Sequence, residues 1–260
     1  MKNQDVEENL KLPSHTIYEI ISAGGKEELS RPNTSLAWSG IVAGICISFC
    51  YMTEAVIKHH LPQSGNFFLI ENLGYTIGFL IVILGRFQLF TENTITVILP
   101  LLDHFRMRTL LNVARLWGVV LLANMVGTFT VALLISNLPF FAPELFDAFI
   151  DISKHAIHRD MGDVFIQAIP AGFIIALLVW MLPSSKGNEI WIIILMTYLI
   201  AIGDFAHIVA GSGEAFLLML NGHASLLEGA QYLVAACVGN IIGGTFLFAF
   251  MAYAQVKEEI

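Results

Sequence analysis

The sequence predicts an all-α membrane protein with six transmembrane helices, arranged as an inverted repeat whose second and fifth helices are broken. Three observations support this prediction: the composition, the lengths of the apolar stretches and a motif that occurs twice. Hydrophobic residues make up 56% of the 260 residues and charged residues only 13%, against about 25% charged residues in soluble domains. A chain with so few charged residues is expected to be embedded in a membrane.

Four uninterrupted apolar stretches are long enough to cross a bilayer, which takes about 20 residues of helix. Residues 36–57 carry only Glu54, near the end of the stretch. The other three stretches, 116–135, 164–182 and 231–253, contain no charged residue. We therefore expect one unbroken helix in each of the four.

Two further apolar stretches, 73–102 and 190–220, are 30 and 31 residues long. As straight helices they would measure about 45 Å, against a hydrocarbon core of roughly 30 Å. Each contains a Gly-x-Phe sequence, at Gly85 and again 118 residues later at Gly203. We expect each stretch to form two half-helices, joined by non-helical backbone whose polar groups protein or water must satisfy.

Other features recur at a similar spacing and predict two related halves. The sequence Asn-x-x-Gly occurs at Asn124 and returns 116 residues later at Asn240. Small residues at 40, 43 and 44 find a weaker match at 168, 171 and 172, where they would let helices approach closely. Three crossings per half invert the second half, about 160–254, relative to the first, about 35–137. Broken helices at corresponding positions of two such halves indicate a substrate path.

Basic residues predict which side of the membrane each loop faces. Arg86 lies inside a span, and nine of the other twelve lysine and arginine residues fall on the side of the termini. Because cytoplasmic loops are enriched in lysine and arginine, both termini are expected in the cytoplasm. Residues 1–34 are then a cytoplasmic segment, 35–256 the transmembrane channel domain and 257–260 a cytoplasmic tail.

A short amphipathic helix is expected within the N-terminal segment. Ser14 would cap it, Ile17, Ile20 and Ile21 would form its apolar face, and Gly24-Gly25 would interrupt it. We expect this helix to lie at the cytoplasmic interface.

The two breaks contain the residues for which we expect a functional role. His207 lies deep in a span, and its imidazole can donate a hydrogen bond to an anion or exchange a proton near neutral pH. The alternative is a histidine that only fills space in the core. Thr91 follows the first break and offers an uncharged hydroxyl, whereas Glu92 and Asn93 either cap the second half-helix or face the path.

Arg86 and Asp204 occupy equivalent places, each directly after the glycine of a break. A lone charge at the centre of a transmembrane helix costs about 2.5–3.5 kcal/mol on insertion scales. We therefore expect the two to form a buried ion pair across the repeat interface. Otherwise Arg86 reaches to the membrane surface and Asp204 caps a half-helix. No third ligand accompanies the paired loop histidines at suitable spacing, so no metal site is expected.

Three motifs resemble the formate/nitrite transporter family: Leu89-Phe90-Thr91, Phe205-Ala206-His207 and the sequence Gly-Asn-Ile-Ile-Gly-Gly from residue 239. Longer strings at 71–76, 89–94 and 115–122 are similar to its bacterial inner-membrane YfdC-type branch. The resemblance covers essentially the whole chain. It implies an aquaporin-like protomer in a homopentamer, with one pore per protomer for small monovalent anions such as formate, nitrite or hydrosulfide, or their conjugate acids.

On the family pattern, the break residues line the path between two apolar constrictions. The residues so implied are His207, Thr91, Leu89, Phe90, Tyr75, Phe79 and Ile200, with the constrictions near Tyr75, Phe79, Leu89 and Ile200. Formate channels usually carry an acid before the Leu-Phe-Thr motif and a glutamate before the histidine, where this chain has Gln88 and Ala206. The resemblance therefore leaves the substrate open within this class.

We expect a passive or proton-coupled channel in the bacterial inner membrane whose partners are a small anion, the lipid bilayer and identical subunits. Neither an enzyme nor a nucleic-acid-binding protein is expected, and no cofactor is implied. One alternative is an aquaporin-like pore for a neutral solute, which is disfavoured because neither break carries Asn-Pro-Ala. The other is a non-conducting membrane scaffold, which the changed polar pore residues favour.

Overall fold

The computed structural model describes residues 12–62 and 64–259, and its elements over these ranges are helical. Of the expected N-terminal segment, residues 1–11, with Lys2 and Lys11, lie outside the described residues, as does Ile260. Four continuous helices are long and apolar enough to cross a membrane, and each contains one of the four uninterrupted stretches. They are Asn33–His60, Met107–Asn137, Met161–Ser184 and Leu226–Val256.

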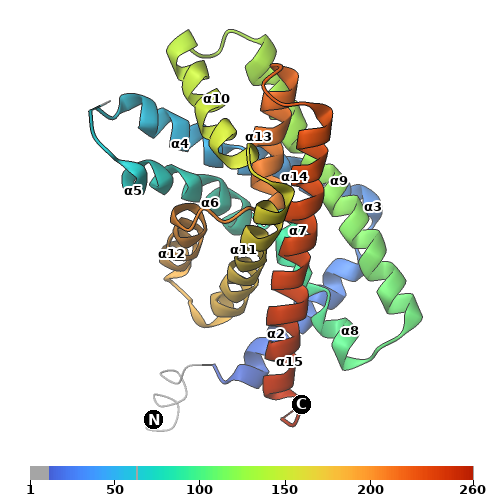
Figure 1. Ribbon diagram of the computed structural model, residues 1–260. Helices are drawn as coiled ribbons and strands as arrows, with labels where there is room; N and C mark the ends of the chain where they lie inside the picture. The colour runs from blue at the N-terminus through green and yellow to red at the C-terminus, as the bar shows by residue number, and fades with distance from the viewer. Residues whose placement is uncertain (1–11, 63, 260) are drawn as a thin grey trace.

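Short connections join the elements along the chain (Figure 1). The elements are α2 (Ser14–Ser30), α3 (Asn33–Ile47), α4 (Phe49–His60), α5 (Phe68–Glu71), η1 (Asn72–Tyr75), α6 (Thr76–Leu84), α7 (Phe90–Thr96), α8 (Leu99–Asp103), α9 (Met107–Asn137), α10 (Pro143–Ile157), α11 (Met161–Met181), η2 (Leu182–Ser184), α12 (Glu189–Ile202), α13 (Ile208–Leu220), α14 (Leu226–Ile241), η3 (Ile242–Ala249) and α15 (Phe250–Val256).

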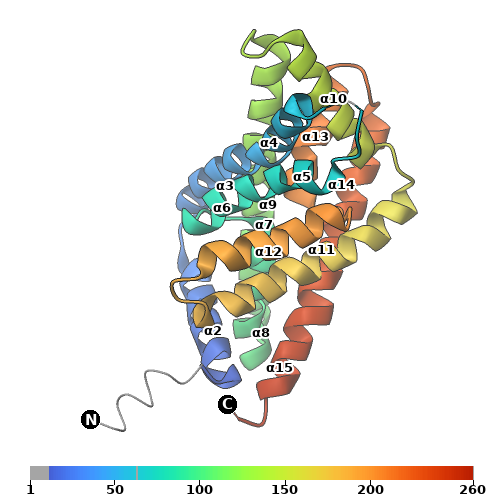
Figure 2. The same ribbon diagram turned by 90° about the vertical axis from the view of Figure 1, so that its left-hand side faces the viewer.

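The helices form one bundle with distinct ends. Figure 1 shows α10 at one end, α2 and α15 at the opposite end, and α7 and α13 between them. The elements α14, η3 and α15 form one continuous rod, of which η3 is a π-helical segment. Figure 2 shows α6, α11 and α12 running at a steep angle to this rod.

Both long apolar stretches are broken, as predicted: α6 stops before Gly85 and α12 stops before Gly203. The backbone turns one residue later, at Arg86 (φ 54°) and Asp204 (φ 58°), which are the non-glycine residues with positive φ in the described part of the chain. Both break glycines keep right-handed helical φ. A Cβ on either glycine would overlap the ring of the phenylalanine two residues later, so the motif makes room for that ring.

The small residues predicted to allow close helix packing do so in two helix pairs. A Cβ on Gly44 of α3 would overlap the backbone of Asn124 in α9. In the same way, a Cβ on Gly172 of α11 would overlap the backbone of Asn240 in α14. Each pair therefore brings an asparagine-bearing helix against its partner at backbone distance.

The N-terminal helix α2 differs from its predicted form. It continues through Gly24 and Gly25, and Ser14 is its first residue and makes no capping hydrogen bond. A glycine inside a helix costs about 1 kcal/mol, which the docking of α2 on α7 and α8 offsets. Gly25 lies against the backbone of Thr96, where a Cβ would not fit. Ile17 and Ile21 are buried, whereas Ile20 is 46% exposed.

Candidate functional site

The first break is held by a buried asparagine of α9. Asn124 Oδ1 accepts a hydrogen bond from the backbone N–H of Phe90, at 2.9 Å. Its Nδ2 donates to the carbonyls of Gly40 and Gln88, both at 2.8 Å. Backbone groups that the broken helix leaves without partners are thereby satisfied inside the bundle.

The second break is held in the same way by an asparagine of α14. Asn240 Oδ1 accepts from the N–H of Ile208 at 2.8 Å. Its Nδ2 donates to the carbonyls of Ala168 and Ala206, at 2.7 and 2.9 Å. Neither asparagine has any exposed surface. The recurring Asn-x-x-Gly motif therefore marks two equivalent clamps.

The half-helices α7 and α13 meet where the breaks end. Thr91 Oγ1 and His207 Nε2 are 2.8 Å apart, and both side chains are buried. His207 Nδ1 accepts a hydrogen bond from the N–H of Ala210 at 3.2 Å and so caps α13. A neutral imidazole carries one ring proton, so an accepting Nδ1 places that proton on Nε2, which donates to Thr91. His207 is thus both a helix cap and a hydrogen-bond donor.

Aromatic and aliphatic side chains lie on one side of His207. The ring of Phe79 lies edge-on to the imidazole, with centroids 5.0 Å apart, and the ring of Tyr75 is 5.5 Å from that of Phe79. Ile200, which has no exposed surface, lines the same cavity as Tyr75 and His207. Phe79 and Thr91 therefore contact His207 directly, and Tyr75 and Ile200 share its cavity.

The two remaining path residues belong to the first break. Leu89 is the last residue before α7 and is fully buried, in the place that His207 takes before α13. Phe90 packs on Trp117 of α9, with ring centroids 5.8 Å apart. Glu92 and Asn93 lie within α7 and do not cap it. The first break is therefore apolar where the second carries an imidazole.

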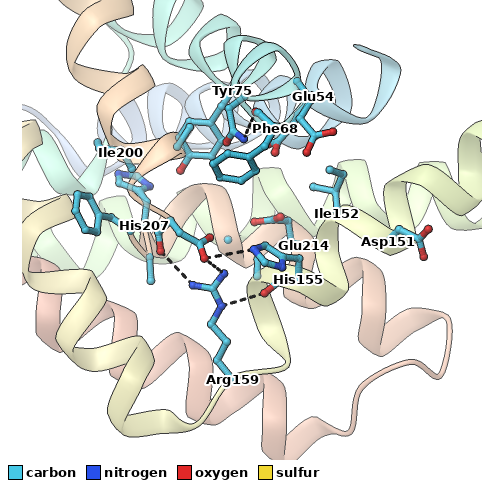
Figure 3. A pocket seen from close by; sticks show the side chains of 18 of the residues that line it. Glu54, Phe68, Tyr75, Asp151, Ile152, His155, Arg159, Ile200, His207 and Glu214 are labelled. Atoms are coloured by element: carbon cyan, nitrogen blue, oxygen red, sulfur yellow. Dashed lines mark hydrogen bonds and ion pairs between the residues drawn. The ribbon is translucent and has the colours of Figure 1, made fainter. Parts of the chain in front are cut away.

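A cavity of about 380 Å³ connects the region of His207 with α10 (Figure 3). Three of the predicted path residues, Tyr75, Ile200 and His207, line it together with Asp204. Its wall also includes Glu214, a carboxylate within the apolar half-helix α13 that sequence reasoning missed. The signal was present, since an ionisable residue in a transmembrane segment indicates a functional site.

Asp204 has a different partner from the predicted one. Its Oδ2 lies 2.5 Å from Nη2 of Arg159 and 3.3 Å from Nε2 of His155. Arg86 forms no ion pair within the described ranges and lines a separate cavity with Glu28. The expected Arg86–Asp204 pair is therefore wrong. From their breaks, α7 and α13 run toward opposite ends of the molecule (Figure 1), so equivalent residues do not face each other.

Arg159 is the residue that completes this group. Its Nη1 donates to Gln167 Oε1 at 2.6 Å and to the carbonyl of Asp204 at 3.1 Å, and its Nε donates to the carbonyl of His155 at 3.0 Å. Together with the ion pair to Asp204, these bonds engage all three guanidinium nitrogens. The sequence offered no indication that Arg159 reaches the second break.

The first break is tied to the N-terminal helix through Gln88. Glu28 of α2 accepts hydrogen bonds from Thr96 Oγ1 at 2.6 Å and from Gln88 Nε2 and Asn93 Nδ2, both at 3.2 Å. Burial raises the pKa of the Glu28 carboxyl, while the three hydrogen bonds lower it. Ala206, the equivalent of Gln88 in the second break, offers no such link.

Comparison with known proteins decides the family. The family model described as formate/nitrite transporter matches residues 15–254. The chain belongs to the formate/nitrite transporter family. The inner membrane protein YfdC of Escherichia coli (strain K12) is 40% identical over 262 residues, covering 100% of this chain and 84% of that protein. The formate channel BtFdhC of Bacillus thuringiensis is 24% identical, covering 94% and 95%.

Solved structures share the fold of this formate/nitrite transporter family member. A structure described as an FNT family ion channel has a TM-score of 0.81 at 16% identity, covering 93% of this chain and 99% of that one. A pentameric formate channel with formate bound has a TM-score of 0.69 at 19% identity, covering 91% and 99%. The family resemblance inferred from the break motifs is confirmed.

Proposed function

We propose that this formate/nitrite transporter family member is a channel of the bacterial inner membrane that conducts a small monovalent weak-acid anion, such as formate or nitrite, or its conjugate acid. The observation that supports this most is the hydrogen bond between Thr91 and His207 where α7 and α13 meet. There, an imidazole N–H and a hydroxyl lie between buried apolar side chains, so a permeating anion would find donors at one level of the path.

The neutral imidazole suggests in which protonation state the anion passes the apolar side chains. Protonating His207 Nδ1 would displace the N–H of Ala210, so the observed bond favours an uncharged ring. A charge crossing Phe79, Leu89 and Ile200 would leave water without a counter-charge. We therefore propose that the anion passes as its conjugate acid, or with its charge briefly stabilised by Nε2–H and the start of α13.

The architecture proposed for this channel is six crossings in two inverted halves, about 35–137 and 160–254. Its support is the pair of asparagine clamps, the two positive-φ residues and the two matched helix contacts. Residues 1–34 and 257–260 would form the cytoplasmic segments flanking the domain 35–256, in keeping with the distribution of basic residues. A homopentamer is proposed because a fold neighbour is described as pentameric.

A flux panel in liposomes tests the function. Purified full-length protein would be reconstituted and assayed with formate, nitrite, hydrosulfide, water and glycerol, with protein-free liposomes as the control. We expect saturable flux of at least one of the three weak-acid anions. Flux of water or glycerol alone would instead establish a neutral-solute pore, and no flux of any solute would establish a scaffold. Native mass spectrometry in mild detergent tests the pentamer, which a stable monomer or tetramer would contradict.

A further inference from the structure

The cavity between His207 and α10 is lined by more carboxyl groups than basic groups. Two permanently cationic side chains line it, Lys58 and Arg159, and the nitrogens of Arg159 are all engaged. Five carboxyl side chains face them: Glu54, Glu71, Asp151, Asp204 and Glu214. This balance favours the approach of a cation over that of an anion.

Of these five residues Glu214 is the buried one, and the described residues provide no partner for its carboxyl group. It is 7% exposed and lies seven residues after His207, on the same face of α13. Its carboxylate makes no hydrogen bond or ion pair with the residues that the structure describes, and it borders the cavity (Figure 3). A buried carboxylate without a partner is costly, so its surroundings suit a ligand that brings a positive charge or a donor.

Tyr232 of α14 is a second polar side chain of this kind. It is 4% exposed, lines the same cavity, and its hydroxyl makes no hydrogen bond within residues 12–62 and 64–259. Carboxylate and hydroxyl come from different helices, α13 and α14, and border one space. The cavity therefore contains two buried hydrogen-bonding groups that a ligand would satisfy.

The chemistry of the wall indicates which cation fits. Across the described ranges, no three His, Cys, Asp or Glu side chains are grouped closely enough to hold a metal ion. Four phenylalanine and tyrosine residues line the cavity instead: Phe68, Tyr75, Phe205 and Tyr232. Figure 3 shows the rings of Phe68 and Tyr75 across the cavity from Arg159. Aromatic faces attract alkylammonium groups, and about 380 Å³ suits a small organic molecule.

We propose that this cavity binds a small organic ammonium cation, with its N–H groups on Glu214 and Tyr232 and its alkyl part against Phe68 and Tyr75. The site goes beyond the proposed anion conduction, since it requires no particular permeant. Because the cavity leads to His207, the bound cation occupies the route to the Thr91–His207 pair and reduces flux through it.

Binding of radiolabelled methylammonium to the purified full-length protein tests the site directly, in sodium chloride at constant ionic strength. We expect saturable binding to the wild type, weakened roughly tenfold by Glu214→Gln, because a charge-assisted hydrogen bond is lost. Glu144→Gln, an exposed residue of α10 outside the cavity, is the matched control and should bind like the wild type. Phe68→Leu, at a partly exposed position, should weaken binding severalfold by removing a ring face.

Two results would overturn the proposal: no saturable binding of methylammonium to the wild type in the presence of sodium chloride, or unchanged binding in Glu214→Gln. If Glu214→Gln does not fold, Phe68→Leu tests the proposed site instead, and unchanged methylammonium binding in Phe68→Leu rejects it. The assay measures binding and not flux, so its failure leaves the liposome result for anion conduction standing.

Discussion

The two helix breaks have the same backbone and different side chains. At each break, a buried asparagine satisfies one backbone N–H and two carbonyls, and one residue adopts positive φ. The residue before the half-helix is Leu89 at the first break and His207 at the second. The residue directly before the half-helix is therefore ionisable only at the second break.

The charged residues of the breaks differ as well. Arg86 is exposed and forms no ion pair among the described residues, whereas Asp204 lies against Arg159 and His155. The first break instead contacts α2 through Gln88 and Glu28. The second break thus borders the cavity beside α10, and the first is linked to the N-terminal helix.

The largest effect should come from removing either clamp. Asn124→Ala and Asn240→Ala each leave one backbone N–H and one carbonyl of a break without partners, at about 1–3 kcal/mol per group. The third carbonyl, of Gly40 or Ala168, lies inside a helix and keeps its helical hydrogen bond. We expect both variants to lose similar amounts of stability, at least about 2 kcal/mol. Thermal unfolding in detergent measures this, with the exposed Asn137→Ala as control. A clamp variant as stable as the control would show that the breaks do not depend on these bonds.

The next largest effect is expected on anion flux, when the residue before each half-helix is replaced. His207→Phe should lower anion flux in liposomes roughly tenfold or more, equal to a barrier increase of about 1.4 kcal/mol. His207→Asn keeps a polar donor and should retain part of the flux with an altered pH dependence. Leu89→Val should change flux by less than about twofold, since no polar group is lost.

Size-exclusion profiles must show that these three variants assemble like the wild type. Should both His207 variants assemble and conduct as the wild type does at every pH, the histidine is a structural cap, and the proposed role in conduction fails.

A third prediction concerns the ion pair of the second break. Arg159→Met should lower the free energy of unfolding by about 1–2 kcal/mol, less than for a fully buried pair because the Asp204 side chain is 41% exposed. Arg86→Met should stay within about 0.5 kcal/mol of the wild type. In a double-mutant cycle, Arg159→Met and Asp204→Asn should be less than additive. Additive losses would mean that the two side chains do not interact.

Glycine substitution at the two positive-φ residues also distinguishes Arg86, unpaired in the described part of the chain, from the paired Asp204. Arg86→Gly should raise the free energy of unfolding by about 1 kcal/mol, because glycine adopts φ near 54° without strain. Asp204→Gly relieves the same strain but loses the contacts with Arg159 and His155, so no net gain is expected. Equal gains at both positions would argue that the Asp204 contacts contribute nothing.

The smallest effect should come from the link between α2 and the first break. Because the pKa of Glu28 is raised in the folded protein, the folded state holds this proton more tightly than the unfolded chain. The resulting stabilisation is present near pH 4.5 and is lost as pH rises through the raised pKa. Glu28→Gln, compared with the exposed Glu27→Gln, should therefore gain relative stability toward neutral pH, by less than about 1 kcal/mol. Parallel melting curves at all pH values would rule out this titration.

Much of the fold could be predicted because it follows from length and backbone chemistry. A bilayer of given thickness limits the length of a helix, so residues 73–102 and 190–220 had to break. The backbone exposed by a break needs partners inside the membrane, and the repeated Asn124 and Asn240 supply them. The predicted interruption of α2 at Gly24-Gly25 was wrong, since local propensity is weak against the docking of a whole helix.

By itself, the sequence determined the apolar spans, the two breaks, the small-residue contacts and the placement of His207 and Thr91 at the breaks, because periodicity, length and glycine act locally. Only the tertiary structure decided which side chains these residues contact. It paired Asp204 with Arg159 instead of Arg86, oriented His207 so that Nε2 meets Thr91, and placed Glu214 in a cavity with Tyr232. These contacts join residues far apart in the chain, and their geometry depends on how the helices cross.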